Sequence, residues 1–263
     1  MNETTAALQK LLDTSRPIVF FGGAGVSTES GIPDFRSEHG LYRQSYRFPP
    51  ETILSHTFFQ QHTEEFFAFY REKMLVTNVL PNRVHYFLAE AEQAGILSGI
   101  VTQNIDGLHQ AAGSRRVIEL HGSIHRNHCL RCGRFYSAEW MQQSTGIPHC
   151  SCGGIVKPDV VLYEESLNDR DITEAVSLIS EADTLLVGGT SLSVYPAASF
   201  LHYFHGRNLV LINQSATPYD TKATLLLPFR LGEVFSALTL PEKQTKTTQS
   251  EATQIEAEVN THE

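Results

Sequence analysis

The 263-residue sequence has no excess of basic residues and no long apolar run. It contains 20 Lys and Arg against 29 Asp and Glu, so its formal net charge is −9. This sign argues against a chain-wide phosphate-binding surface and against nucleic acid as a partner. No run approaches the roughly 20 apolar residues of a membrane span. The first residues, MNETTAALQKLLDTSRP, also lack the basic and apolar regions of a secretory signal. We therefore expect a cytoplasmic protein without a membrane segment.

Cysteine is scarce, and its four copies are clustered. Cys129-x-x-Cys132 and Cys150-x-Cys152 lie in one short segment. In a reducing compartment this pattern favours a zinc-thiolate site over disulfides or idle thiols. Four thiolates leave zinc no open position, so we predict one structural ion. The second pair has one residue between its cysteines, where zinc ribbons usually have two. His128 and His149 therefore remain alternative zinc ligands.

Apolar content changes sharply near the C-terminal end. Over the whole chain 41% of residues are apolar and 10% are aromatic, which is enough for a folded body. From Pro241 onward almost none are apolar. Such a segment cannot bury enough surface to offset the entropy of ordering, so residues 241–263 are predicted to be a disordered tail.

Short apolar runs alternate with segments of helical periodicity. Strands are expected at residues 18–21, 100–102, 117–120, 160–162, 184–187 and 209–212. Helices are expected at residues 4–13, between 50 and 76, at 81–95 and 171–179, and from about 196. This alternation predicts an α/β protein with a Rossmann-like, doubly wound parallel sheet. Ligands of such sheets bind at the carboxyl ends of the strands.

The domain organisation follows from these elements. Residues 1–40, 98–123 and 155–240 are predicted to form a discontinuous Rossmann-like domain. Residues 41–97 are interpreted as a helical insertion, and residues 124–154 as a small zinc-binding module.

A glycine-rich turn, Gly22-Gly23-Ala24-Gly25-Val26-Ser27, follows the first expected strand. Glycines at this place let a nucleotide pyrophosphate approach backbone N–H groups. The dinucleotide fingerprint requires a third glycine where this chain has Thr28. Taken alone, the fragment therefore also fits a tight strand-to-helix turn without a ligand.

Several separated motifs occur together in one order. They are GAGVSTESGIPDFR from Gly23 to Arg36, then Gln103-Asn104-Ile105-Asp106, His121-Gly122, the paired cysteines, Gly189-Thr190-Ser191 and Asn213. Together they resemble the sirtuin family, the NAD-dependent protein lysine deacylases, in a compact bacterial-type form. The resemblance extends from about Leu8 to Leu238. It implies that the acyl-lysine carbonyl oxygen attacks C1′ of the nicotinamide ribose of NAD, giving nicotinamide, O-acyl-ADP-ribose and free lysine.

The resemblance also implies roles for individual residues. His121 matches the general base, for which imidazole is suited because its pKa lies near physiological pH. Asn104 matches a catalytic amide that orders water near the ribose. The matching cofactor-binding residues are Gly23, Ala24, Gly25, Thr28, Phe35, Arg36, Gln103, Ile105, Asp106, Gly189, Thr190, Ser191, Asn213 and Val234.

Val160, Val161, Leu162 and Tyr163 resemble the family's substrate-binding segment, where the backbone pairs with an acyl-peptide strand. Glu164 stands where the family often has Gly, and it and Glu165 would favour a basic substrate. An equally acceptable interpretation is a strand followed by a solvated acidic turn.

The acyl group and the reaction have alternatives. Tyr42, Arg43, Tyr46 and Arg47 do not register on the pattern of succinyl-preferring sirtuins, so acetyl or another neutral acyl group is expected. ADP-ribose transfer to protein is the second hypothesis, and a non-catalytic NAD sensor is the third. The expected partners are acyl-lysine proteins or peptides, and a monomer is favoured.

Overall fold

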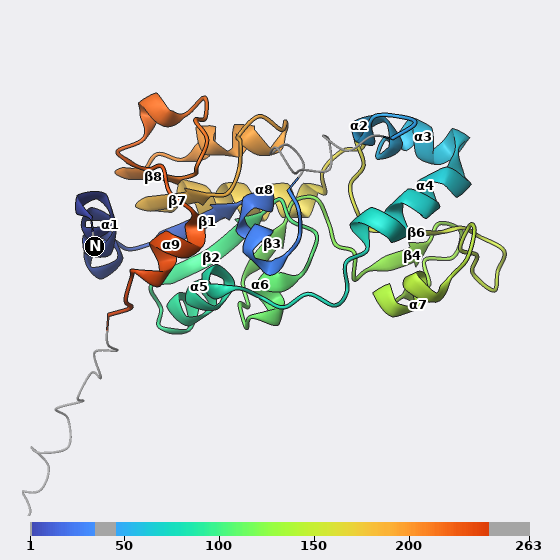
Figure 1. Cartoon of the computed structure of the whole chain (residues 1–263), viewed down its shortest axis with the longest axis horizontal. Coiled ribbons are helices and arrows are strands. Elements are labelled where there is room, and N and C mark those ends of the chain that lie inside the picture. Colours follow the sequence, from blue (N-terminus) through green and yellow to red (C-terminus); the bar gives the residue numbers. More distant parts are fainter. Residues whose placement is uncertain (1, 35–45, 242–263) are drawn as a thin grey trace, which may run out of the picture.

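The computed structural model describes residues 2–34 and 46–241, which form a large domain and a smaller one (Figure 1). The large domain contains a six-stranded sheet in the order β3-β2-β1-β7-β8-β9, and each neighbouring pair is parallel. Its strands are β1 Ile18–Gly22, β2 Leu97–Thr102, β3 Val117–Glu119, β7 Thr184–Gly188, β8 Asn208–Ile212 and β9 Leu225–Leu227. The strand order reverses between β1 and β7. This is the switch point at which doubly wound sheets bind ligands.

The central strand β1 is buried on both faces, which explains its uninterrupted apolar sequence. Ile18 and Phe20 pack against helices on one face, and Val19 and Phe21 pack on the other. The first face is covered by α1 Glu3–Thr14, α5 Arg83–Gln93 and α9 Leu231–Ser236. The second is covered by α8 Asp169–Ser180 and the 3₁₀ helix η5 Ala197–Tyr203. The predicted fold class is confirmed.

The small domain combines a helical layer with a three-stranded sheet (Figure 1). The helical layer consists of α2 Pro50–Ile53, α3 His56–Gln61, α4 Thr63–Phe69 and the π-helix η4 Tyr70–Met74. The sheet, in the order β5-β4-β6, contains β4 Asn127–Cys129, β5 Phe135–Tyr136 and β6 Val156–Pro158, and α7 Ala138–Gln143 lies beside it. Aromatic residues of the helical layer share one core with Cys129, Cys150, Met141 and Val156. The helices and the cysteine segment are therefore one packed body.

Helix α5 lies inside the predicted insertion 41–97 but packs on the main sheet. Val84, Phe87 and Leu88 lie in the same cluster as Ile18 and Phe20. The helix begins at Arg83 rather than Pro81, because the side chain of the N-cap residue Asn82 accepts the Val84 N–H. We propose that the insertion proper ends before Asn82.

Two parts of the sequence prediction differ from the structure. Residues 160–162 were expected to be a strand, but the strand in this region is β6 Val156–Pro158. Val161 N–H bonds to the loop carbonyl of His121 instead of to a neighbouring strand, so no ladder forms. In addition, β9 and α9 complete the sheet domain without having been predicted, because each is short.

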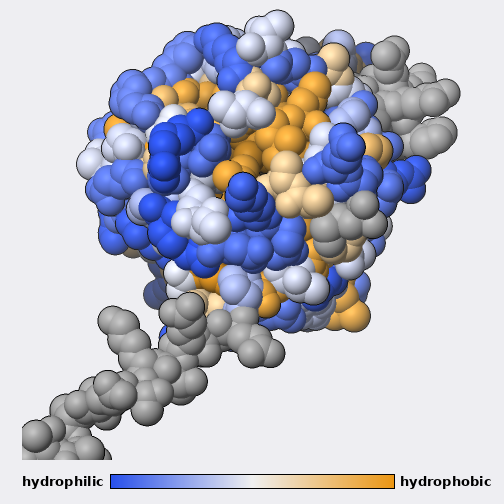
Figure 2. Space-filling view, turned by 90° about the vertical axis from the view of Figure 1, so that its left-hand side faces the viewer, coloured by the Kyte–Doolittle hydropathy of each residue, from blue (hydrophilic) through white to orange (hydrophobic). Residues whose placement is uncertain are grey.

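Within the described residues, no helix has the length and apolar character needed to cross a membrane. Figure 2 shows the end of the molecule nearest α1, where an apolar area is surrounded by hydrophilic residues.

Candidate functional site

The glycine-rich turn packs directly on the loop that follows β7. Gly23 N–H donates to the carbonyl of Gly188 at 3.2 Å, and Gly25 N–H donates to that of Gly189 at 2.8 Å. A Cβ on Gly25 would lie 2.7 Å from Gly189 Cα, and a Cβ on Gly23 would lie 2.7 Å from Thr190 Cβ. The turn therefore requires glycine to let two backbones meet at the switch point. This glycine cradle lies where doubly wound sheets bind nucleotides.

Three polar residues beyond the turn form a hydrogen-bonded group. Ser27 Oγ donates to Asp106 Oδ2 at 2.6 Å, and Asn104 Nδ2 donates to Ser27 Oγ at 3.0 Å. Asp106 Oδ1 accepts the Leu108 N–H at 2.9 Å and so caps the short helix α6 Leu108–Ala111. Ser27 was not among the predicted site residues. Its only sequence signal is its position directly after the glycine-rich turn.

His121 is held by a backbone carbonyl. Its Nδ1 lies 3.0 Å from Gln103 O, and because a carbonyl oxygen can only accept, Nδ1 carries the proton. In the neutral ring Nε2 then holds the free lone pair. Burial lowers the pKa of His121, and the bond to the Gln103 backbone opposes that shift. The ring therefore stays neutral, and able to accept a proton, at physiological pH.

Gln103 joins this histidine to the second glycine loop. Its N–H donates to Gly22 O at 3.0 Å, and its Nε2 donates to Thr190 Oγ1 at 3.0 Å. Thr190 is 8% exposed, and Gly189 before it has a φ of 62°, which favours glycine. The predicted residues of the glycine-rich turn, the Gln103–Asp106 motif, His121 and the Gly189–Ser191 loop thus lie at one edge of the sheet.

The other predicted cofactor residues have varied surroundings. Thr28 Oγ1 donates to Gly25 O, Ser191 Oγ pairs with Ser193 Oγ, and Asn213 Nδ2 donates to Ser215 O. Ala24 begins the 3₁₀ helix η1 Ala24–Val26, and the carbonyl of Ile105 accepts the Ile124 N–H.

Val234 differs, since its side chain is 2% exposed and packs in the core. That side chain is therefore not available to a cofactor. Phe35 and Arg36 lie outside the described residues.

The predicted substrate segment, Val160–Tyr163, is an extended strap held at several points. Val161 N–H donates to His121 O, and Tyr163 N–H donates to Leu54 O. The Tyr163 carbonyl accepts the His56 N–H at 3.0 Å. The strap therefore joins the loop of the predicted base to the helical layer of the small domain.

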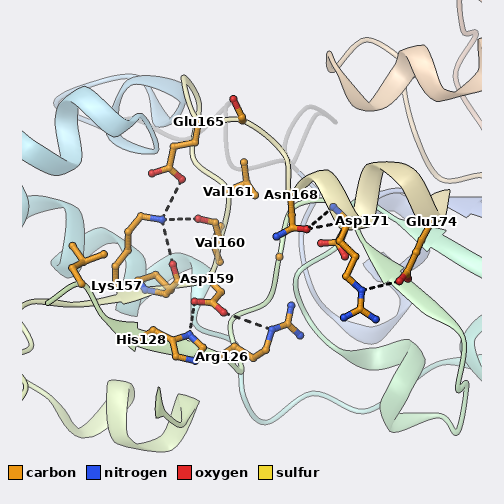
Figure 3. A pocket seen from close by; sticks show the side chains of 15 residues that line it. Arg126, His128, Lys157, Asp159, Val160, Val161, Glu165, Asn168, Asp171 and Glu174 are labelled. Atoms are coloured by element: carbon orange, nitrogen blue, oxygen red, sulfur yellow. Dashed lines mark hydrogen bonds and ion pairs between the residues drawn. The ribbon is translucent and has the colours of Figure 1, made fainter. Parts of the chain in front are cut away.

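Lys157 and Glu165 brace the strap from one side (Figure 3). Lys157 Nζ donates to Val160 O at 2.9 Å and pairs with Glu165 Oε2 at 3.2 Å. The same carboxylate oxygen accepts the Leu162 N–H at 2.9 Å. The second carboxylate oxygen, Oε1, lies 2.9 Å from His56 Nδ1. The charge of Glu165 is thus balanced within the protein.

Glu164 has a φ of 74°, a conformation that glycine adopts more readily. This explains why the resemblance places glycine here. Its Oε2 accepts both the N–H and the Oγ1–H of Thr57, at 2.9 and 2.7 Å, and these bonds lower the pKa of the carboxyl group. The side chain is exposed and stays ionised.

Two of the residues weighed for acyl selection lie on the helical layer. The Tyr46 ring packs edge-on against Phe69 at 5.3 Å, and Arg47 lies 3.9 Å from Glu65. Tyr42 and Arg43 lie outside the described residues.

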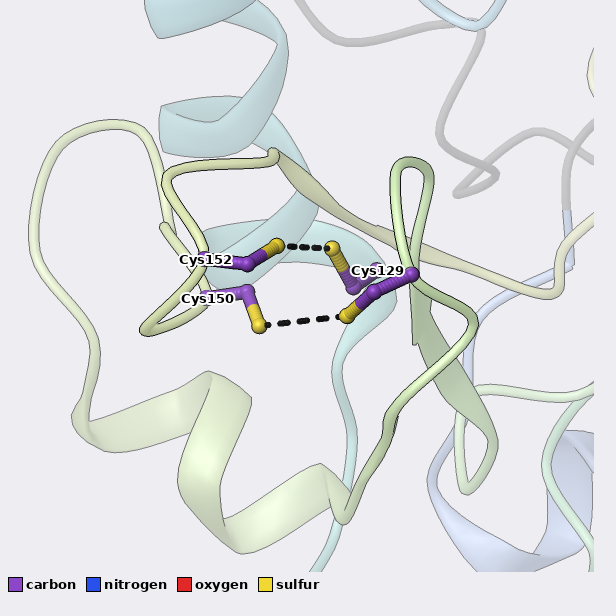
Figure 4. Close-up of side chains that lie close together, drawn as sticks. Cys129, Cys150 and Cys152 are labelled. Carbon is purple, nitrogen blue, oxygen red and sulfur yellow. Dashed lines mark hydrogen bonds between the residues drawn. The ribbon is translucent and has the colours of Figure 1, made fainter.

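The four cysteines converge on one point in the small domain (Figure 4). Cys129 Sγ lies 3.5 Å from Cys152 Sγ, and Cys132 Sγ lies 3.6 Å from Cys150 Sγ. All four sulfurs lie within 4.8 Å of one another. Tetrahedral zinc with bonds of about 2.3 Å requires sulfurs about 3.8 Å apart, so the donor set fits this ion. The alternative ligand His128 instead bonds to Asp159, and His149 is not in the cluster.

A doubly wound sheet with a glycine cradle at its switch point, beside a four-cysteine zinc ribbon, defines a nucleotide-binding α/β enzyme with a structural metal site. The particular family follows from comparison with known proteins. The chain belongs to the Sir2 family, whose sequence profile matches residues 23–196.

The similar proteins cover nearly the whole described chain. It is 60% identical over 235 residues to an NAD-dependent protein deacetylase of Clostridium acetobutylicum, covering 88% of this chain and 96% of that protein. Another from Clostridium tetani is 52% identical over 240 residues, covering 90% and 97%. A solved Sir2 homolog–NAD complex has a TM-score of 0.81 at 36% identity, covering 88% of this chain and 91% of the other. A Sir2 structure bound to acetylated peptide has a TM-score of 0.80 at 35% identity, covering 90% and 97%.

Proposed function

We propose that this chain is an NAD-dependent protein lysine deacetylase with His121 as general base. The products are nicotinamide, O-acyl-ADP-ribose and the free lysine. Family membership and the deacetylase relatives at up to 60% identity support the reaction. The NAD and acetylated-peptide complexes of similar structures support the two substrates.

One observation carries the role of His121: the Nδ1–H bond to Gln103 O that leaves Nε2 as the free base. NAD would supply the nicotinamide ribose, whose C1′ would accept the acyl oxygen as its bond to nicotinamide breaks. His121 takes a proton at Nε2 from a ribose hydroxyl, which the lowered pKa allows at neutral pH. Its position relative to the strap is fixed because its own carbonyl accepts the Val161 N–H.

The other residues hold the substrates. The glycine turn and the Gly189-Thr190-Ser191 loop bind NAD at the switch point, and Asn213 contributes at the end of β8. Asp106, held by Ser27, binds the nicotinamide side, and Asn104 orders the ribose hydroxyls. The strap Val160–Tyr163 adds the acyl-peptide as an extra strand, which gives affinity with little sequence selection.

The four cysteines hold one zinc ion that stabilises the small domain. Because all four positions of the metal are filled by protein, it takes no part in the reaction. We further propose that the partners are acyl-lysine proteins in the cytoplasm and that the enzyme acts as a monomer on a neutral acyl group. The packing of Tyr46 and Arg47 against the helical layer is consistent with a neutral group.

The test is nicotinamide release from NAD with and without an acetyl-lysine peptide, beside His121→Ala, with products identified by mass. Peptide-dependent release with O-acetyl-ADP-ribose and free lysine supports the proposal. ADP-ribose on protein without loss of acetyl groups would establish the transferase instead. Binding of NAD without any release would identify a sensor, although an oriented base such as His121 has no use there.

A further inference from the structure

Two histidines that the proposed reaction does not use lie buried beside the predicted nicotinamide side of the site. His85 on α5 is fully buried, and His109 on α6 is 1% exposed. Their ring centroids are 4.8 Å apart with an interplanar angle of 63°. His109 also packs edge-on against Phe20 of the central strand. The pair thus lies between α5, α6 and the central strand β1, and Figure 1 shows the two helices beside each other.

The hydrogen bonds of the pair are incomplete. Asn82 N–H donates to His85 Nδ1 at 3.2 Å, which places the ring proton of neutral His85 on Nε2. That nitrogen and both ring nitrogens of His109 have no hydrogen-bond partner among the described protein atoms. Burial lowers the pKa of His85 to about 4 and that of His109 to about 3. Both rings are therefore neutral, and between them they carry buried donors and acceptors without a protein partner among the described residues.

These donors and acceptors suit a buried water molecule. A buried water makes two to four hydrogen bonds to otherwise unsatisfied polar groups, and each ring of the pair has an unpartnered nitrogen. A metal ion fits less well, because no third ligand joins the two imidazoles among the described residues. Apolar side chains would fill the same space without desolvating imidazole nitrogens, so core packing alone does not explain the pair.

Both histidines connect to the site through short paths. Asn82, which bonds to His85, donates from Nδ2 to Val26 O at 2.8 Å and to Ser30 Oγ at 3.0 Å. These two residues flank Ser27, which bonds to Asp106. On the other side, His109 follows Leu108, whose N–H bonds to the same Asp106.

These contacts therefore connect Asp106 to the histidine pair from two sides, through Asn82 and Ser27 on one side and through Leu108 on the other. The carboxylate of Asp106 raises the pKa of His85, although burial lowers that pKa more strongly. A shift of either histidine would move α6, and with it the carboxylate that Ser27 holds.

We propose that His85 and His109 are positioning residues which, bridged by a buried water, hold Asp106 and helix α6 against the glycine-rich turn. This role rests on the proposed function, because Asp106 is placed there on the nicotinamide side. It predicts that the pair controls affinity for NAD and nicotinamide rather than affinity for the peptide.

The test compares His85→Phe and His109→Leu with the conservative variants His85→Gln and His109→Gln. We expect the apolar variants to raise KM for NAD and the half-inhibitory concentration of nicotinamide about tenfold, with peptide KM changed less than twofold. The glutamine variants, which keep a polar atom, should recover part of this loss. Phe87→Leu is the matched control, since it disturbs a different buried contact of α5, the one with Phe235, and should leave both NAD values unchanged.

NAD binding by calorimetry is measured for each folded variant, because it does not need turnover. If wild type binds NAD but releases no nicotinamide, the proposed function fails, and the binding data still decide the positioning role. Equal changes in NAD and peptide KM, or NAD affinities matching those of Phe87→Leu, would overturn the role. If the apolar variants do not fold, the glutamine variants decide the question. A glutamine variant that binds NAD as tightly as wild type, although its crystal structure shows that the water is lost, would overturn the positioning role.

Discussion

The imidazole of His121 and the backbone carbonyl of Gln103 lie 3.0 Å apart, and this one contact fixes the tautomer of the proposed base. The same Gln103 reaches Thr190 through its side chain. The orientation of the base and the placement of the second cofactor loop are therefore set by one residue at the end of β2.

Burial lowers the pKa of His121, so the neutral base should persist below the ordinary value of about 6.5. We expect the acid limb of the kcat/KM profile to fall below pH 6.5, because protonation removes the lone pair on Nε2. Initial rates from pH 5 to 8 measure this limb, with bound zinc assayed at each pH to exclude loss of the metal. A limb centred above pH 7 would contradict the assignment.

Gly122→Ala should impair the strap. Gly122 has a φ of 74°, and a Cβ there would lie 1.7 Å from Asp159 O. We expect a loss of roughly 2–4 kcal/mol in the free energy of unfolding, together with a raised peptide KM. Gly95→Ala is the matched control, because its φ is 73° and nothing lies within 4 Å of the new Cβ. Denaturant unfolding compares the two, and equal losses would mean that backbone strain alone is responsible.

The sequence predicted the parts of the fold that depend on local pattern. Continuous apolar runs identified β1, β7 and β8, since strands buried on both faces leave no polar positions. The strap was mistaken for a strand because its hydrogen-bond partners, His121 and Leu54, are remote in sequence. The pairing of His85 with His109 also depends on the packing of two helices, which isolated histidines do not reveal.

Some residues of the candidate site could be predicted from a local sequence pattern, and others depend on contacts between distant parts of the chain. The four cysteines have a spacing that is typical of zinc sites, so they were predicted directly. The glycine turn was assigned to the cofactor only through the resemblance, because its own spacing lacks the third glycine of the dinucleotide fingerprint. The bond from Ser27 to Asp106 joins residues far apart in the chain, and a common serine gives no signal of it. The burial of the Val234 side chain was not predicted, because the resemblance does not show which side of this segment faces the core.

Removal of zinc should unfold the helical layer as well as the cysteine segment. Cys129 and Cys150 share one core with the phenylalanines of α3 and α4. We expect Cys150→Ser to lose zinc and a substantial part of the helical circular-dichroism signal of the small domain. His149→Ala, beside the ligand but exposed and outside the cluster, should retain both. Zinc loss without any change in helix content would refute the shared core.

Glu164→Gly should change substrate preference more than stability. Glycine relieves the positive φ, which costs about 1 kcal/mol in other residues, while two hydrogen bonds to Thr57 are lost. The carboxylate favours peptides with Lys or Arg beside the acyl-lysine, so the variant should lose a several-fold preference for them in kcat/KM. The preference should also weaken at high salt. Glu51→Gln, an exposed carboxylate outside the strap, serves as control. An unchanged preference in the Glu164 variant would exclude this role.

The buried histidine pair should make stability depend on pH. In the unfolded chain these rings titrate near 6.5, whereas in the folded protein their pKa values are about 4 and 3. Below pH 6.5 the unfolded state therefore binds more protons, and the free energy of unfolding falls as pH decreases. We expect a loss on the order of 4 kcal/mol between pH 7 and pH 5, about 2 kcal/mol from each histidine, that is smaller in His109→Gln. Urea unfolding at both values measures it, and identical slopes for wild type and variant would argue against neutral buried rings.

The strap between His121 and the helical layer has a thermodynamic consequence for recognition. Because its backbone is already fixed by Leu54, His56, Lys157 and Glu165, the enzyme loses little freedom when a peptide binds. Nearly all of the conformational entropy lost on binding is therefore lost by the peptide. Peptides that are extended in solution, or constrained to be so by cyclisation, should bind more tightly than flexible ones of the same sequence, and the difference should appear in the entropy of binding.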